Sequence, residues 1–287
     1  MTFREKKNSF TSSPFGPPPA RLPRTSELGI QRLVRAEDLS VVFQPIVMLP
    51  SMKLFAYEAL VRCGITSLMP PPILFERAVD ERCTGRLGRM IREVATTLCP
   101  GIQLFLNVHP AELSEGWLVR PDDPIYSHDA RIFLEVTESV PMTERALCNS
   151  VLREVRDRAR VAIVVDDLGA GFSNLKYIAD LEPEIVKLDR ELVANLEKNK
   201  RQCILVKSLV ALCNDLDAKV VAEGIETEGE LEALLDLGVP LGQGYLLARP
   251  SYPPPAIVTP PCMGKRARGP RTTPSGGSRR RRSDAPR

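Results

Sequence analysis

The stretch Val164-Val165-Asp166-Asp167-Leu168-Gly169-Ala170-Gly171 joins the end of an apolar run to two adjacent carboxylates and two glycines. The run Ile163 to Val165 predicts the end of a buried strand, and the glycines allow a sharp turn after it. Neighbouring carboxylates at a strand end repel one another unless a cation or a shared proton compensates. Asp and Gly are also common in solvated turns, so this stretch alone is compatible with a site or with a surface turn.

Strands and helices alternate on both sides of this stretch. Apolar runs predict the strands, and apolar residues at helical spacing predict the helices between them. The predicted strands cover residues 41–47, 54–62, 103–108, 132–137, 161–166, 185–188, 219–222 and 241–247, and the predicted helices cover 30–39, 74–98, 144–158, 173–178, 204–212 and 227–237. The first two strands are separated by a short turn and predict a hairpin. The alternation is typical of a parallel α/β fold, and the number of strands suits a (β/α)8 barrel.

Charge is distributed unevenly along the 287 residues, whose overall net charge is +3. Residues 1–27 carry five basic and two acidic side chains, and residues 259–287 carry nine basic and one acidic side chain, so the part between them has a net charge of −8. Both ends are rich in Pro and basic residues without apolar periodicity. We therefore expect a disordered segment over 1–27, one domain over 28–255 and a disordered basic tail over 256–287.

Membrane and secretion signals are not visible in the sequence. No apolar run is long enough to span a bilayer, and the polar start of the chain lacks the apolar region of a secretory signal. The seven cysteines are scattered and form no Cys-x-x-Cys pair. This pattern favours reduced thiols in a cytoplasmic protein over a disulfide framework or a zinc site.

Polar residues follow or interrupt seven of the predicted strands. These residues are Glu58, Asn107, Glu135, Asp166 with Asp167, Lys187, Glu223 and Gln243. In a (β/α)8 barrel the carboxyl ends of the strands meet on one face, where active sites lie. An isolated cap or buried partner would explain one such residue, but a contribution from seven strands indicates a common site.

The residue types in this set indicate the chemistry. Carboxylate and amide oxygens suit Mg²⁺ or Mn²⁺, and the lack of Cys and His in the set disfavours zinc. The adjacent Asp166 and Asp167 could serve two ions, and paired ions promote phosphoryl displacement. A lysine beside them could orient a water molecule or stabilise developing charge.

Several motifs, in order along residues 38–250, resemble those of the EAL-domain cyclic-di-GMP phosphodiesterases. The matching segments are Phe43-Gln44-Pro45-Ile46, Glu58-Ala59-Leu60, Asn107-Val108-His109-Pro110, Glu135-Val136-Thr137-Glu138, Asp166-Asp167-Leu168-Gly169-Ala170-Gly171, Val186-Lys187-Leu188-Asp189, Ala222-Glu223-Gly224-Ile225-Glu226 and Gly242-Gln243-Gly244-Tyr245. The resemblance implies a modified (β/α)8 TIM barrel with one antiparallel strand, which agrees with the predicted hairpin. It also implies a homodimer.

The resemblance assigns roles to individual residues. Glu58, Asn107, Glu135, Asp166 and Asp167 would bind two Mg²⁺ or Mn²⁺ ions, with Asp166 bridging them. Lys187 and Glu223 would position the attacking water, and Glu58 would belong to the catalytic set with them. Gln44, Leu60, Arg62, Asp189 and Gln243 would contact the dinucleotide, and Glu138 and Glu226 would steady the loop after Asp167.

The implied reaction opens one phosphodiester of cyclic di-GMP and gives linear pGpG. The alternative is a non-catalytic cyclic-di-GMP receptor that acts through a protein partner. Because every metal-ligand position is occupied by an oxygen ligand, the enzyme is favoured. The sequence departs from the family pattern at three positions. Leu168 and Ala170 replace Phe and Thr in the loop near the family's dimer interface, and His109 stands where a small hydroxyl is common. These changes bear on the rate or the regulation of the reaction.

Other features keep two interpretations open. Glu138 and Glu226 could be helix-start carboxylates favoured by the helix dipole instead of loop partners. The run Arg279 to Arg282 could bind a protein partner, nucleic acid or an acidic membrane surface, or it could be a solvated tail. His109 fits a structural role better than a metal-binding one.

Overall fold

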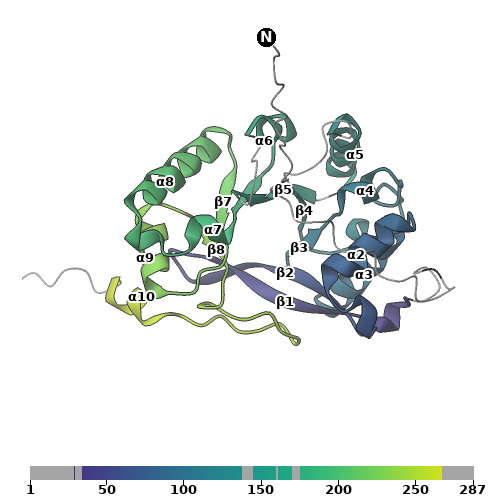
Figure 1. Cartoon of the computed structure of the whole chain (residues 1–287), viewed down its shortest axis with the longest axis horizontal. Coiled ribbons are helices and arrows are strands. Elements are labelled where there is room, and N and C mark those ends of the chain that lie inside the picture. The colour runs from purple at the N-terminus through teal and green to yellow at the C-terminus, as the bar shows by residue number, and fades with distance from the viewer. Residues whose placement is uncertain (1–28, 30–33, 138–144, 160, 170–174, 267–287) are drawn as a thin grey trace, which may run out of the picture.

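The computed structural model describes residue 29 and residues 34–137, 145–159, 161–169 and 175–266. In these ranges eight strands form one closed barrel in sequence order, as Figure 1 shows. The strands are β1 (Leu39–Met48), β2 (Lys53–Cys63), β3 (Leu104–Asn107), β4 (Ile132–Thr137), β5 (Val161–Leu168), β6 (Ile185–Leu188), β7 (Lys219–Ala222) and β8 (Leu241–Gly242).

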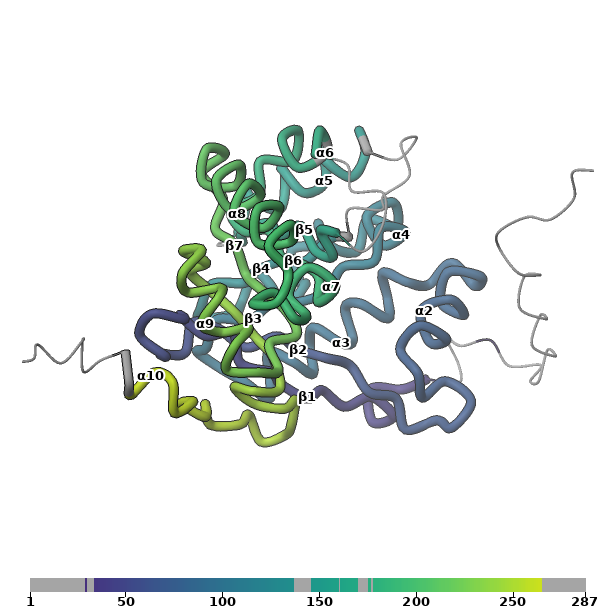
Figure 2. The backbone as a smooth tube through the Cα atoms, turned by 60° about the vertical axis from the view of Figure 1, so that its left-hand side comes forward, coloured from purple at the N-terminus to yellow at the C-terminus, as the bar shows by residue number. Residues whose placement is uncertain are grey.

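Helices surround the barrel on its outside (Figures 1 and 2). The α-helices are α2 (Pro71–Asp80), α3 (Thr84–Leu98), α4 (Pro110–Leu113), α5 (Arg145–Arg158), α6 (Leu175–Leu181), α7 (Arg190–Val193), α8 (Lys200–Asp215), α9 (Glu228–Asp236) and α10 (Pro261–Arg266). Short 3-10 turns lie at Ala36–Asp38, Thr66–Leu68, Pro124–Tyr126 and Leu196–Lys198. None of the helices in the described part of the chain is long and apolar enough to cross a membrane.

The first strand runs against all the others. β1 pairs antiparallel with both β2 and β8, whereas β2 to β8 are parallel from neighbour to neighbour. The prediction of a modified TIM barrel with one antiparallel strand is therefore confirmed. Pro45 precedes a bulge between Ile46 and Val47, as expected for proline inside a strand.

Two apolar layers hold the barrel together. The interior is filled by Ile46, Ala56, Phe105, Phe133, Ala162, Val164, Ile185, Val221 and Leu241. The rings of Phe105 and Phe133 stack with their centroids 4.4 Å apart. A larger cluster lies between the strands and the helices, because alternate residues of each strand face the two sides of the sheet. Because both faces of the strands are covered by apolar side chains, the polar strand residues can gather only at an end of the barrel.

Two element boundaries differ clearly from the sequence predictions. The first predicted helix was to end at Leu39, but β1 begins there, and residues 30–33 lie outside the described residues. The last strand has two residues and not seven, because the chain turns after Gly242 into a loop whose backbone bonds to Ile225 and Gly244. The capping box at Thr227 and Glu230 starts α9 as predicted.

The C-terminal boundary of the folded domain also differs from the prediction. Residues 256–266 were expected to be disordered, yet α10 lies among them and Cys262 is only 1% exposed. The segment before α10 bonds to the hairpin at two places. Phe43 on β1 exchanges backbone hydrogen bonds with Ser251, and the Tyr57 hydroxyl on β2 donates to the Pro255 carbonyl at 2.9 Å. This segment covers part of the hairpin that the helices leave open (Figure 1), so the domain extends to α10.

Candidate active site

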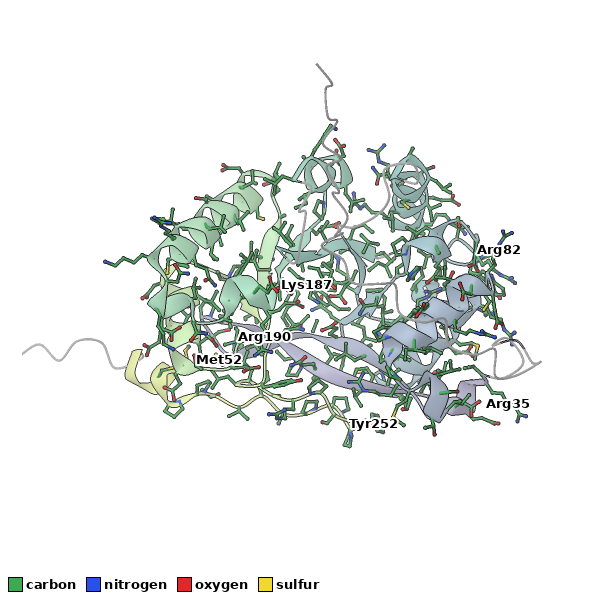
Figure 3. All side chains as sticks on the ribbon, viewed as in Figure 1. Arg35, Met52, Arg82, Lys187, Arg190 and Tyr252 are labelled. Carbon is green, nitrogen blue, oxygen red and sulfur yellow. The ribbon has the colours of Figure 1, made fainter. Side chains whose placement is uncertain are left out.

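The strand ends bring four carboxylates around one buried lysine, which lies inside the ring of strands in Figure 3. Lys187 on β6 is 1% exposed. Its Nζ lies 2.6 Å from Glu223 Oε1, 2.7 Å from Glu135 Oε1, 3.2 Å from Asp166 Oδ1 and 3.6 Å from Glu58 Oε1. The four acids come from different strands or strand ends, so barrel closure alone places them together.

Two amides extend this cluster. Gln243 Nε2 donates to Glu58 Oε2 at 2.6 Å and to Glu223 Oε1 at 3.3 Å. Asn107 Nδ2 lies 3.4 Å from Glu58 Oε1, and Asn107 pairs with Glu135 across β3 and β4. Seven of the eight polar residues predicted to share a site therefore meet in this cluster, and Asp167 directly follows one of them, Asp166.

The backbone turns sharply at the second aspartate. Asp167 has a φ of 60°, a left-handed conformation that non-glycine residues adopt at a cost. This turn brings carboxylate oxygens of Asp166, Asp167 and Glu223 within 4.8 Å of one another. Gly169 follows with a φ of 111°, and a side chain there would collide with Leu192. Gly169 thus serves the turn, and Gly171 lies outside the described residues.

Burial and charge control protonation in this cluster. Burial lowers the pKa of Lys187, but Asp166, Glu135, Glu223 and Glu58 outweigh it and hold that pKa well above its usual value. Burial is also the main reason that the pKa of Glu223 rises to about 8, with Lys187 acting in the opposite direction. The pKa of Glu135 rises for the same reason. Burial thus favours the neutral form of Glu135 and Glu223, while the surrounding carboxylates keep Lys187 charged.

The donor set fits hard divalent cations. Its donors in the described part of the chain are oxygens from carboxylates and one amide, the ligands Mg²⁺ and Mn²⁺ prefer. Glu135 Oε1 and Asp166 Oδ1 face Lys187 Nζ, whereas Glu135 Oε2 is buried with no hydrogen-bond partner among the described residues. A buried carboxylate oxygen is costly to leave unpaired, and a cation would satisfy it.

A cavity of about 350 Å³ opens from this cluster toward α2 and α3. Asn107, Glu135, Asp166 and Asp167 line its polar end. The rest of its lining is mostly apolar and includes Leu60, Ile91, Pro71, Pro72 and Phe75, together with Arg62 and His109. The cavity therefore combines a carboxylate-rich wall with a mostly apolar wall.

His109 has a structural role in this wall. Its Nδ1 accepts a hydrogen bond from the Ala111 backbone at 3.1 Å and caps α4. Its ring stacks on Phe75 with an interplanar angle of 10°. The structure thus agrees with the structural interpretation of His109, and it adds Phe75 and the two prolines, which the sequence suggested only as a loop and a helix start.

The other predicted substrate and loop residues lie around the cluster. Gln44 is buried and donates to the Ala248 carbonyl at 3.2 Å. Asp189 caps α7 by accepting from the Glu191 backbone at 2.7 Å, a structural use that the sequence did not indicate. Glu226 pairs with Arg190 at 3.0 Å. Glu138 lies outside the described residues.

A second buried charge network was not predicted. Arg92 on α3 is fully enclosed and pairs with Glu112 on α4 at 2.5 Å and with Asp123 at 2.7 Å. Burial raises the pKa of Glu112 to about 7 against the opposing effect of Arg92. α4 directly follows the strand that carries Asn107, so this network fixes the position of that segment. Its sequence signal is weak, because the three residues are far apart along the chain.

Comparisons with known proteins agree with this geometry. The chain is 29% identical over 238 residues to the bifunctional diguanylate cyclase/cyclic di-GMP phosphodiesterase MucR of Pseudomonas aeruginosa, a match that covers 77% of this chain and 34% of MucR. It is 31% identical over 168 residues to the cyclic di-GMP phosphodiesterase RocR of the same species, covering 57% of this chain and 42% of RocR. The chain thus spans less than half the length of these relatives.

A solved structure and a family model complete the comparison. The manganese and cy-diGMP complex of Klebsiella pneumoniae BlrP1 at pH 6 matches with a TM-score of 0.65 and 29% identity, over 76% of this chain and 57% of that chain. The model of the EAL domain matches residues 28–250, which include every strand and each polar residue of the cluster. With the barrel, its reversed first strand and the oxygen-rich site in place, the chain belongs to the EAL domain family.

Proposed function

We propose that this protein hydrolyses cyclic di-GMP to linear pGpG with Mg²⁺ or Mn²⁺. The observation that carries the proposal is the buried Lys187 surrounded by Glu58, Glu135, Asp166 and Glu223 beside the cavity. The relatives named as cyclic di-GMP phosphodiesterases support the choice of substrate.

Two metal ions would be held by Glu58, Asn107, Glu135, Asp166 and Asp167, and Asp166 would be shared between them. Bound divalent ions would polarise the phosphate and lower the pKa of a water ligand. Glu223 is grouped with Asp166 and Asp167 by distance, so it lies close enough to orient that water.

Two residues have separate roles in this reaction: one accepts a proton, and the other stabilises negative charge. Hydrolysis forms one bond from the water oxygen to phosphorus and breaks one ester P–O bond; the water loses a proton, and the leaving ester oxygen takes one up from solvent to become a hydroxyl group of pGpG. Lys187 is held protonated because its neighbours raise its pKa, so it donates hydrogen bonds to developing negative charge and does not act as the base. Glu223 is the proton acceptor in this proposal, since its raised pKa of about 8 suits a base near neutral pH.

Substrate contacts are assigned to the cavity and its rim. Leu60 and Arg62 line the cavity, Gln44 lies opposite Glu58 in the hairpin, and Asp189 and Gln243 directly follow β6 and β8. We assign the steadying of the loop after Asp167 to Glu138 and Glu226. The protein is further proposed to be a cytoplasmic homodimer whose basic tail is available to a protein partner or an acidic surface.

The direct test is incubation of the full chain with cyclic di-GMP and either Mg²⁺ or Mn²⁺, followed by chromatography of the nucleotides. Formation of pGpG that stops on addition of a chelator supports the proposal. The matched control is Glu223→Gln, which keeps the size of the side chain and its hydrogen bonding but cannot accept the proton.

Tight binding of cyclic di-GMP without turnover in either metal would refute the enzyme and favour the receptor that acts through a partner. Calorimetry with the same samples separates these outcomes, because it reports binding whether or not hydrolysis follows. Ca²⁺ should support binding with little turnover, because it is larger and accepts looser coordination.

A further inference from the structure

A second cavity, of about 360 Å³, lies beside α3. One wall is formed by four residues of this helix at positions i, i+3, i+4 and i+7, which lie on one side of a helix. They are Arg86, Arg89, Met90 and Glu93. The residues of α3 that line the cavity beside the carboxylate cluster are Ile91 and Arg92. No described residue lines both cavities, so the second cavity, here called the α3 cavity, is separate from the active site.

The other walls of the α3 cavity come from distant parts of the chain. Val34, Arg35 and Ala36 lie where the described chain enters the barrel, and Trp117 follows α4. Figure 3 shows Arg35 at the outer edge of the molecule. Trp117 packs against the backbone of α3, because a side chain at Gly85 would collide with its indole ring. Three separate segments therefore enclose the cavity.

The lining of the α3 cavity has an excess of positive charge. It contains the arginines Arg35, Arg86 and Arg89 and the single acid Glu93, which gives a net charge of +2. Residues 28–258 together have a net charge of −8. The cavity is thus opposite in charge to the rest of this part of the chain, and it favours an anion.

A further arginine lies at the edge of this cavity. The guanidinium carbon of Arg120 is 4.6 Å from the centre of the Trp117 ring. Arg120 and Arg89 both pair with the carboxylate of Asp122, each at 3.1 Å. One carboxylate cannot neutralise two guanidinium groups, so the positive excess extends to this edge.

Two of the lining arginines can bind a ligand without loss of a strong internal contact. Arg35 pairs with Glu37, but these side chains are 73% and 70% exposed, and such pairs contribute little because water screens them. Arg89 Nε is enclosed and donates to no acceptor among the described residues. A buried donor without an acceptor is unfavourable, and an anion oxygen in the cavity would accept its hydrogen bond.

We propose that the α3 cavity binds a nucleoside monophosphate, with the phosphate held by Arg35, Arg86 and Arg89. A phosphate monoester carries close to two negative charges at neutral pH, and guanidinium groups bind its oxygens through paired hydrogen bonds. Met90 and Trp117 offer an apolar wall to the flat base, and the methionine sulfur contacts aromatic rings favourably. The volume lies in the range of small-molecule sites, about 300–1,000 Å³.

Calorimetry of the full chain with GMP, AMP and guanosine tests the proposal. EDTA in all samples keeps divalent ions out of the active site. A nucleoside monophosphate should bind, and guanosine should bind at least about tenfold more weakly than GMP because it lacks the phosphate that the arginines hold. Absence of binding by both GMP and AMP would overturn the proposal. Guanosine that binds as tightly as GMP would overturn the role of the arginines.

Substitutions in the cavity locate the bound nucleotide. Arg35→Gln and Arg86→Gln should each weaken GMP binding about tenfold, and the exposure of Arg35 means that its replacement leaves the fold intact. Ala36→Phe keeps every charge but fills the cavity, and it should also weaken binding. The matched control is Arg82→Gln, which removes the same charge at an exposed position outside the lining. Equal effects of Arg82→Gln and Arg86→Gln, or unchanged binding in Ala36→Phe, would overturn the location.

An active-site variant separates the two cavities. Asp166→Asn should bind GMP like the unmodified chain, because Asp166 lines only the other cavity. Loss of GMP binding in this variant would place the nucleotide in the active site and overturn the proposal. Hydrolysis of cyclic di-GMP is measured separately on the unmodified chain. A chain that hydrolyses this substrate but does not bind GMP would refute only the α3 cavity, so the two proposals can fail independently.

Discussion

Replacing Lys187 by Met should change stability, metal binding and turnover in different directions. Methionine keeps much of the length of the side chain but removes the ammonium group, leaving four carboxylates within 3.6 Å of an empty position. Breaking a buried ion pair costs about 3–5 kcal/mol. For a domain of this size each kcal/mol shifts Tm by about 2–4 °C, so Tm in EDTA should fall by about 6–20 °C.

The loss should depend on pH and on metal. Without Lys187 the acids can relieve their repulsion only by taking up protons, so the variant should be more strongly destabilised at pH 8 than at pH 6. Mn²⁺ should recover most of the lost Tm, because the cation replaces the missing positive charge. Differential scanning fluorimetry with EDTA or Mn²⁺ at both pH values measures these effects.

Turnover should fall by about 10²–10³, the effect of losing one preorganised donor to the transition state. Mn²⁺ affinity by calorimetry should be at least that of the wild type, because lysine is not a metal ligand. A variant with unchanged Tm in EDTA would refute the charge balance deduced for the cluster. Wild-type turnover would show that Lys187 has only a structural role.

Three further predictions concern other parts of the structure. Asp166→Asn should lower both Mn²⁺ affinity and turnover, turnover by several orders of magnitude, because a bridging charge is lost; calorimetry and nucleotide chromatography measure the two effects, and unchanged metal affinity would contradict the bridge. Glu112→Gln should flatten the dependence of stability on pH, because the pKa of Glu112 is about 7 in the folded chain against 4.5 as its usual value. The folded state then holds a proton that the unfolded state releases, so this contribution to stability is present at low pH and is lost as pH rises through 7. Urea unfolding from pH 5 to 8 measures the free energy of unfolding of both proteins. The interpretation is wrong if this free energy changes with pH in the variant as steeply as in the wild type. A chain ending at residue 266 should keep its Tm and turnover, whereas one ending at residue 250 should lose stability, since Ser251, Pro255 and the buried Cys262 are removed; equal Tm values for both truncations would show that the final segment does not support the hairpin.

Local sequence patterns determined much of this protein. The alternation of apolar runs and amphipathic segments predicted the barrel, because each strand and helix must bury one face whatever its neighbours are. The capping box at Thr227 and Glu230 predicted the start of α9, because both bonds are made within one turn. The motifs identified the eight polar residues of the site, since in a closed parallel barrel strand ends can meet only on one face.

Contacts between distant segments were decided only by the tertiary structure. The central position of Lys187 among four acids depends on strands separated by up to 129 residues along the chain, from Glu58 to Lys187. The Arg92, Glu112 and Asp123 network and the packing of α10 likewise join segments that no local period relates. A charged or proline-rich segment looks solvated in the sequence, because its local pattern contains no apolar face. Such a segment becomes buried only when partners from distant parts of the chain pair with its charges or cover it. Those partners are brought together by the closed barrel.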